Sequence, residues 1–322
     1  MKWICLEPHT HTVHSDAGFT VSDLLSAAKR AQLDAIILTD HNTDTGMDEV
    51  SPDQTDPRGV PGIEWTTFYG HVVIIAPERF VEWRDLTVNN LDPHLRLVHG
   101  ANAVVQMAHP FQPGEPFCCG CHWDFDIPDW TQIDAVEVWS KGDPAWSPWN
   151  KKAYQLWLDK WKEGYRPMAV TARDWHEERD PATVFGVNYL YIDETKPFSE
   201  AVKEAYRRKR GYMTAGPVLS LTVQNSSGNY GIGDTITEGD TVFRIMLDQN
   251  QRTEVWEPYE LEPEQIHLIN NDEVRIFEFP GYGIPLETDL ELREGFVFLE
   301  VYGKAHLRPC KLLMTNPLII RQ

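Results

Sequence analysis

Apolar strand-like runs alternate with helical segments through the first two thirds of the chain. Continuous apolar runs at 34–39 and 71–76 fit strands that are buried on both faces. Helical spacing over 22–31 separates the first of these from an apolar run at 2–6. The alternation continues with strand-like runs at 60–65, 102–108, 134–139 and 166–172 and with helical stretches at 93–100, 150–163 and 199–210. Strands that alternate with helices are typical of a parallel sheet or barrel, so an α/β fold is predicted.

After Pro217 the pattern changes to short β-rich runs that are separated by Gly, Asn, Asp and Pro. These runs lie at 218–223, 241–247, 265–270, 274–279 and 296–303. Such spacing is typical of a small antiparallel β-sandwich. The length of 322 residues also exceeds the roughly 250–300 residues beyond which a single core rarely grows. We therefore predict two domains, 1–217 and 218–322.

The composition limits the partners and the compartment. A net charge of −20 argues against a protein that neutralises nucleic-acid phosphates over a broad face. The sequence has no run of eighteen apolar residues, which argues against a membrane span. Three of the five cysteines crowd into 118–121, unlike an extracellular disulfide framework. We expect a cytoplasmic protein whose partner is a small-molecule substrate, and no pattern indicates its oligomeric state.

Residue types that bind metal ions occur where five of the predicted strands end. His9 and His11 are separated by one residue, so in an extended segment their side chains point the same way and could grip one ion. Near this and the other strand ends stand His14, Asp16, His41, Glu64, His71, His109, Asp174 and His176. The carboxyl edge of a parallel sheet is where active sites assemble. Imidazoles mixed with carboxylates suit Zn, Mn or Fe, so we predict a multinuclear metal site.

These residues, in this order, resemble the PHP superfamily, named for polymerase and histidinol phosphatase, and especially its branch of carbaryl hydrolases of the CehA/McbA type. The matching segments are HTHTVHSD at 9–16, TDHN at 39–42, GIEW at 62–65, AHPF at 108–111, EVW at 137–139, Asp-x-His at 174–176 and RGYMTAGP at 210–217. The resemblance covers roughly residues 4–217. It implies a distorted, TIM-like (β/α)7 barrel that holds two or three divalent ions and hydrolyses phosphoesters with an activated water.

Carried over by position, the resemblance also implies how the ligands are shared. One ion would be held by His9, His11, Glu64 and Asp174, and Glu64 would bridge to a second ion held by His109. A third ion would be held by Asp16, His41 and His176. His71 would be either a ligand of the second ion or the catalytic acid that protonates the leaving group.

Arg173 and Trp175 replace the small residues that are usual around the final Asp and His of this family. Arg173 stands beside two expected ligands, so it could bind a phosphate or carboxylate of the substrate through two parallel hydrogen bonds. The alternative is a salt bridge to Glu177, Glu178 or another neighbouring acid.

The leading hypothesis is a metal-dependent phosphoesterase, with two alternatives. An activated hydroxide could attack a carbamate, carboxylic ester or amide instead. Tryptophans could line an apolar pocket for such a substrate, although core packing is their commoner role, and the candidates are Trp123, Trp130, Trp146, Trp149 and Trp175. The other alternative is a non-enzymatic metal-binding module.

The compact cluster Cys118, Cys119, Cys121 and His122 strains a zinc geometry, which favours packing or free thiols.

Overall fold

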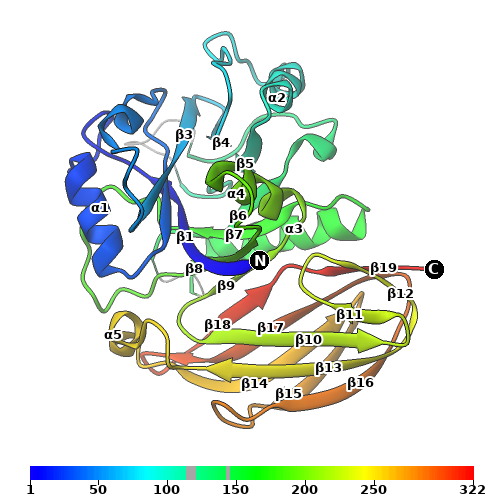
Figure 1. Cartoon of the computed structure of the whole chain (residues 1–322). Helices are drawn as coiled ribbons and strands as arrows, with labels where there is room; N and C mark the ends of the chain where they lie inside the picture. Colours follow the sequence, from blue (N-terminus) through cyan, green and yellow to red (C-terminus); the bar gives the residue numbers. More distant parts are fainter. Residues whose placement is uncertain (114–120, 143–145) are drawn as a thin grey trace.

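The computed structural model describes residues 1–113, 121–142 and 146–322. The N-terminal part mixes helices and strands, as Figure 1 shows. Its strands are β1 (Lys2–Thr10), β2 (Ala35–Leu38), β3 (Arg58–Thr67), β4 (Gly70–Ile75), β5 (Val104–Met107), β6 (Ala135–Ser140), β7 (Met168–Ala172), β8 (Val187–Ile192) and β9 (Gly211–Thr214). Its helices are α1 (Val21–Arg30), α2 (Leu91–Gly100), α3 (Pro148–Lys162) and α4 (Phe198–Arg207), with short 3-10 helices η1 (Thr45–Glu49) and η2 (Trp130–Gln132). The predicted mixed α/β fold is confirmed.

The directions of the strands differ from the expected parallel alternation of a (β/α)7 barrel. β1, β2 and β3 run parallel, and so do β5, β6 and β7. β4 runs antiparallel to both β3 and β5, and β8 runs antiparallel to β1. Only Phe68 and Tyr69 separate β3 from β4, which is too short for the crossover that parallel strands need. The result is a mixed sheet with fewer helices than that alternation requires.

The last strand of this series, β7, returns to β1. The backbone N of His11 donates to the carbonyl of Trp175 over 3.0 Å, and the N of Trp175 donates to the carbonyl of His9 over 3.1 Å. Thr10 and Trp175 form a parallel bridge at the same place. These bonds bring the loop after β7 beside the end of β1, so residues far apart in the sequence share one edge of the sheet.

Local sequence explains the elements that flank this edge. β2 consists of four buried aliphatic residues, three of them long-chain, which suits a strand covered on both faces. α1 begins after Thr20, whose side chain accepts from the backbone N of Asp23 while Asp23 accepts from the backbone N of Thr20. Leu24 and Ala28 on α1 then pack into the core beside β2. α1 thus covers the outside of the strands that carry the first loops.

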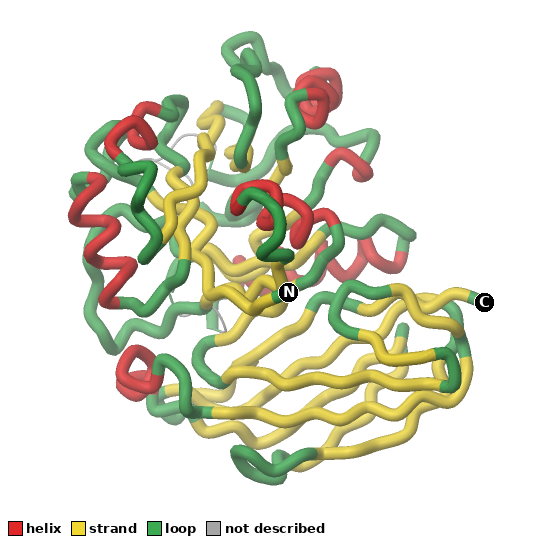
Figure 2. Tube along the Cα trace, in the orientation of Figure 1, coloured by secondary structure: helices red, strands yellow, loops and turns green. Residues whose placement is uncertain are grey.

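The C-terminal part consists mainly of strands, which Figure 2 shows in yellow. They are β10 (Val218–Asn225), β11 (Gly228–Tyr230), β12 (Thr235–Thr237), β13 (Gly239–Asp248), β14 (Glu262–Asn270), β15 (Glu273–Glu278), β16 (Leu286–Leu292), β17 (Gly295–Ala305), β18 (Arg308–Thr315) and β19 (Leu318–Arg321), with α5 (Thr253–Trp256) and η3 (Glu257–Tyr259). β11, β10, β13 and β16 form a sheet of their own. The remaining strands extend the large sheet, because β18 pairs with β9 at Leu313 and Thr214. This differs from a separate sandwich, and the domain boundary at residue 217 stays a prediction.

Aromatic side chains also join the two parts of the chain. Trp157 and Trp161 on α3 meet Phe298 and Phe296 on β17, with ring centroids 5.4 Å apart in each pair. Both tryptophans are buried. Among the described residues, no helix has the length and apolar character needed to span a bilayer.

Candidate metal centre

One cluster of imidazoles and carboxylates lies where the ends of several strands converge. Because β4 is antiparallel, its beginning lies at the same edge as the ends of the parallel strands. The cluster contains all eight predicted metal ligands and His71: His9, His11 and Asp16 from β1 and the loop after it, His41 after β2, Glu64 on β3, His71 on β4, His109 after β5, and Asp174 and His176 after β7.

The first group in the cluster is largely enclosed, with Asp174 at its slightly exposed side. The Nε2 atom of His9 lies 3.3 Å from Glu64 Oε1 and 3.5 Å from Asp174 Oδ1. The Nε2 atom of His11 lies 3.2 Å from the same Asp174 oxygen and 3.5 Å from Glu64 Oε2. One possible ligand atom from each residue lies within 4.8 Å of the others. These four side chains could therefore hold one metal ion.

A second group lies nearer the surface. Asp16 Oδ1 is 3.1 Å from the Nε2 atom of His176 and 3.5 Å from that of His41, and His11 completes the group. The Asp16 side chain is 60% exposed, whereas those of His9 and His11 are fully buried. The cluster therefore opens to solvent on the side of Asp16, His41 and His176.

Glu64 is the centre of the whole arrangement. Its Oε1 atom lies 3.0 Å from His71 Nδ1 and 3.2 Å from His109 Nε2, and its Oε2 atom lies 2.8 Å from His41 Nδ1. His41, Glu64 and His71 form a third group that could hold a metal ion. Each carboxylate oxygen thus lies near imidazoles of more than one group, so Glu64 could be a ligand that the groups share.

Several buried atoms at this centre have no hydrogen-bond partner. They are His9 Nε2, His11 Nδ1 and Nε2, Glu64 Oε2 and Asp174 Oδ1. Buried polar atoms are nearly always hydrogen-bonded, so an unpaired set that converges on shared points needs an explanation. A bound cation is the explanation that the residue types suit, since imidazoles and carboxylates are ligands of first-row divalent metals.

The cluster shifts the pKa values of its own members strongly. Burial alone would raise the pKa of Glu64, but the imidazoles around it, His9 first, hold that pKa well below its usual range. Burial lowers the pKa of His11 to about 4. At the rim, burial opposes protonation of His41, but the neighbouring carboxylates of Asp16 and Glu64 raise its pKa to about 10. Without metal, a proton on His41 therefore offsets part of the negative charge of the carboxylates, whereas His11 stays neutral near pH 7.

Sequence reasoning missed the residues that position these side chains. Glu137 lies 2.7 Å from His9 Nδ1 and accepts from the backbone N of His109 over 2.8 Å. Asp40 accepts hydrogen bonds from the backbone N and the hydroxyl of Thr12 and from the Ser15 hydroxyl, which fixes the loop before Asp16. The segments EVW and TDHN contain Glu137 and Asp40, but nothing in their spacing indicated these partners.

Lys141 was also missed, and it follows β6 at the same edge. Its Nζ atom lies 3.3 Å from Asp174 Oδ2, and its side chain is about half exposed. Lys141, Asp174 and His109 all have positive φ angles, of 64°, 50° and 28°. Non-glycine residues adopt such angles at a cost, and they cluster at functional sites.

Within the described part of the chain, the side chains of the other residues singled out from the sequence do not join the cluster, although the backbone carbonyl of Cys121 lies 3.1 Å from His109 Nδ1. His14 contacts Glu49 over 2.8 Å. The Arg173 side chain lies beside Glu7 and lines a different cavity, and the buried Trp175 ring packs against Phe19. Of the cysteine cluster, Cys118 and Cys119 lie outside the described residues, whereas Cys121 is in a disulfide and is therefore not a free thiol.

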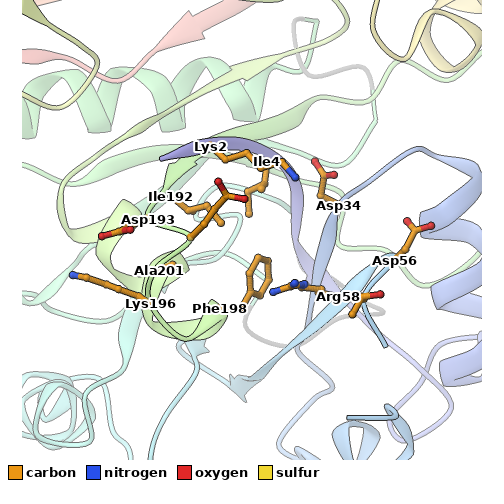
Figure 3. Close-up of a pocket in the computed structure, with 12 residues that line it drawn as sticks. Lys2, Ile4, Asp34, Asp56, Arg58, Ile192, Asp193, Lys196, Phe198 and Ala201 are labelled. Atoms are coloured by element: carbon orange, nitrogen blue, oxygen red, sulfur yellow. The ribbon is translucent and has the colours of Figure 1, made fainter. Parts of the chain in front are cut away.

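Figure 3 shows the residues that line a cavity of about 230 Å³. Lys2 and Arg58 stand at the beginnings of β1 and β3, whereas the cluster lies at the ends of the parallel strands. The cavity is also bordered by the start of α4, with Phe198. The Arg58 guanidinium lies over the Phe198 ring, 4.7 Å from its centroid. Asp34 and Asp56 line the same cavity, so its charges are mixed. No candidate metal ligand is among the described residues that line it.

No protein-family model matches the sequence, and no curated protein matches it significantly. Among solved structures, the chain is similar to a two-domain protein from Bacteroides vulgatus that contains a predicted PHP-like metal-dependent phosphoesterase. The match covers 98% of this chain and 95% of the Bacteroides protein, with a TM-score of 0.51 and 14% sequence identity. A proposed metal-dependent phosphoesterase from Bifidobacterium adolescentis matches 55% of this chain with 89% of its own length, with a TM-score of 0.38 and 17% sequence identity. The match to an amidohydrolase from Chromobacterium violaceum, solved with bound sulfate and no metal, covers 53% of this chain and 87% of the amidohydrolase, with a TM-score of 0.38 and 12% sequence identity. The first similarity shows a shared fold across nearly the whole chain.

Proposed function

We propose that the chain is a metal-dependent phosphoesterase whose centre holds two or three divalent ions around Glu64. The observation that carries this proposal is the set of buried nitrogens and oxygens that converge without hydrogen-bond partners. Leaving a buried polar group unpaired costs about 1–3 kcal/mol, so several together would be strongly destabilising without a cation. The donor types fit Zn, Mn or Fe.

In this proposal the ligands divide into three overlapping sets. Two of them are groups described above, namely His9, His11, Glu64 and Asp174, and His11, Asp16, His41 and His176. The remaining set is Glu64 with His71 and His109, which lie 3.0 and 3.2 Å from Glu64 Oε1. Bound divalent ions would supply an activated water and neutralise charge on a phosphoryl group. His71 is buried with Nδ1 at 3.0 Å from Glu64, which favours a role as ligand over the role of proton donor.

The exposed rim of the cluster is the proposed entrance for the substrate. Lys141 stands there with its ammonium beside Asp174, in a protein whose net charge is −20. A cation at the mouth of an acidic site attracts an anionic substrate, which favours a phosphate ester over a neutral carbamate. Lys141→Met should therefore raise KM for phosphate esters with a smaller change in kcat.

The finer family assignment belongs to the same proposal. We propose that β1 to β9 form a distorted barrel of the PHP type and that the chain lies near the CehA/McbA branch. The motifs at 9–16, 39–42 and 174–176 support this assignment, as do the bonds between the ends of β1 and β7. The similarity to a two-domain protein over 98% of the chain supports an accessory role for 218–322. The cytoplasmic location stays a prediction.

The test combines metal analysis with substrate assays. The purified protein would be assayed with p-nitrophenyl phosphate, its bis-ester and an aryl carbamate, before and after chelation and after return of Mn or Zn. We expect two or three ions per chain and phosphoester cleavage that the metal restores. Glu64→Gln should lose both metal and turnover, while the exposed Glu177→Gln should keep both. Cleavage of the carbamate alone would favour carbonyl chemistry, and a chain that binds no metal would refute the proposal.

A further inference from the structure

Arg173 belongs to the loop that carries Asp174 and His176, yet its side chain lies in a separate cavity. This cavity has a volume of about 360 Å³ and is bordered by α1, the loop after β7, and α5 with η3. Its apolar lining includes Ala27, Trp175, Phe185, Val255 and Tyr259. Among the described residues that line it, none is a candidate metal ligand. It is therefore a different site from the metal centre.

Two aromatic rings hold the guanidinium of Arg173 in place, but its hydrogen-bond donors are not all paired. The residue is only 7% exposed, and its Cζ atom lies 4.7 Å from the Trp175 ring centroid and 4.9 Å from that of Phe185. Its Nε atom is 3.4 Å from Glu7 Oε2 and makes no hydrogen bond. Within the described part of the chain, neither terminal nitrogen has a hydrogen-bond partner, although the backbone N of Arg173 donates to Glu7. The guanidinium therefore borders the cavity with unpaired donors, and these could bind an anionic ligand.

The other charges around the cavity indicate what ligand would fit. Arg30 pairs with Glu178, and Arg179 pairs with Glu177 over 3.6 Å. Asp180 accepts from the backbone N of Ala182. The lining carries three arginines against three acids, namely Arg30, Arg173 and Arg179 against Glu178, Asp180 and Glu254. These charges cancel, and Arg30 and Arg179 are already paired with acids, so the positive charge that the lining offers to a ligand is that of Arg173. One carboxylate matches that single charge, whereas a phosphate dianion would add a further negative charge.

We propose that this cavity is a binding site for a small monocarboxylate with an apolar or aromatic body. The two carboxylate oxygens would accept from the terminal nitrogens of Arg173, whose planar fork matches that geometry. The body would lie against Phe185, Val255 and Tyr259. The cavity volume falls within the range of about 300–1,000 Å³ that small-ligand pockets have. The proposal does not depend on the reaction at the metal centre.

Calorimetric titration with 3-phenylpropionate tests the site, with 3-phenylpropanamide as the uncharged control. Carboxylates also bind metal ions, so the titration is run on both the chelated and the metal-loaded protein. We expect the same affinity in both states and at least tenfold weaker binding of the amide. Binding that requires metal would place the ligand at the metal centre and overturn the proposal.

Two variants then locate the ligand in the cavity. Arg173→Lys keeps the charge but removes the fork, and should weaken binding at least tenfold. Val255→Trp fills the cavity from its half-buried wall without changing Arg173, and should also abolish binding. Circular dichroism and thermal unfolding report whether each variant folds. If Arg173→Lys does not fold, the binding measured with Val255→Trp shows whether the ligand occupies the cavity. Unchanged binding in Val255→Trp, or no binding by the original chain, would overturn the proposal.

Discussion

Glu137 shows how one carboxylate can set the geometry of two candidate ligands. Its Oε1 atom is 2.7 Å from His9 Nδ1, and its Oε2 atom accepts from the backbone N of His109. A carboxylate group accepts this hydrogen bond, so Nδ1 of His9 donates it. With Nδ1 occupied in this way, Nε2 of His9, which faces Glu64 and Asp174, is the atom that could bind a metal ion.

Glu137→Gln should weaken metal binding without unfolding the protein. The amide can donate to His9 Nδ1 and thereby favour the wrong tautomer, and loss of such a partner typically costs about 10- to 100-fold in metal affinity. Metal titration monitored by calorimetry measures the change. The exposed Glu273→Gln should bind metal like the original chain. An unchanged affinity in Glu137→Gln would show that His9 is oriented by other contacts.

The pKa of His41 predicts how the metal-free protein responds to pH. Its folded-state pKa is raised to about 10 from 6.5, because the neighbouring carboxylates of Asp16 and Glu64 outweigh burial. The protonated imidazole therefore contributes stability that is fully present below pH 6.5 and is lost as the pH rises through about 10. The pKa of Glu7 is also raised, from 4.5 to about 7, and this shift changes the stability between those two pH values. It therefore does not mask the loss of stability that His41 causes at higher pH.

Thermal unfolding between about pH 7 and about pH 9 should therefore show a falling Tm for the chelated protein. The metal-loaded protein should show a smaller fall, because the cation replaces the protons. His41→Gln in the chelated state should be less sensitive to pH over the same range. A Tm of the chelated original chain that stays level, or rises, would contradict this prediction.

At the scale of elements, the helix α3 connects the candidate site to the C-terminal strands. It lies between β6, which ends just before Lys141, and β7, which ends just before Asp174. Its buried face carries Trp157, whose ring meets Phe298 on β17 and whose Nε1 donates to the carbonyl of Pro167 over 2.9 Å. α3 therefore packs on two parts of the chain at once.

Trp157→Ala should destabilise the protein by about 3–5 kcal/mol, as expected for truncation of a fully buried aromatic side chain. Chemical unfolding measures the change in free energy. Trp149→Ala is the matched control, because this residue is on the same helix but is only partly buried and contacts Lys152. Its effect should be below about 1 kcal/mol. Equal losses in the two variants would mean that contact with β17 contributes little.

At the scale of the whole molecule, the large sheet is continuous across residue 217. β9 pairs with β18, and the order of the strands runs from β19 through β9 to β7 without a break. Truncation at residue 217 would leave β9 with an unpaired edge and would expose Trp157 and Trp161. Exposed strand edges and apolar patches favour aggregation.

The fragment 1–217 should therefore aggregate or unfold, whereas the full chain should remain soluble. Size-exclusion chromatography and thermal unfolding of both chains test this expectation. A soluble fragment that unfolds cooperatively would show instead that the predicted domain 1–217 is autonomous. Addition of the separate segment 218–322 would reveal whether the two parts reassociate.

The sequence by itself determined where most elements lie and which side chains could bind metal. Helices expected at 22–31, 93–100 and 150–163 correspond to α1, α2 and α3, because local apolar spacing and capping largely decide helix position. The candidate ligands were predicted because metal-binding residue types follow strand ends at one edge. Their grouping in the structure agrees with that prediction, while their role as ligands stays a proposal.

Only the tertiary structure decided how these pieces face one another. The reversal of β4, the pairing of β9 with β18 and the contact of Glu137 with His9 each join residues through geometry that the sequence does not display. Arg173 is the clearest case, since its neighbour Asp174 faces the metal cluster while Arg173 itself borders another cavity. The physical reason is that local patterns decide the type of each element, whereas long-range packing decides the direction in which each side chain points.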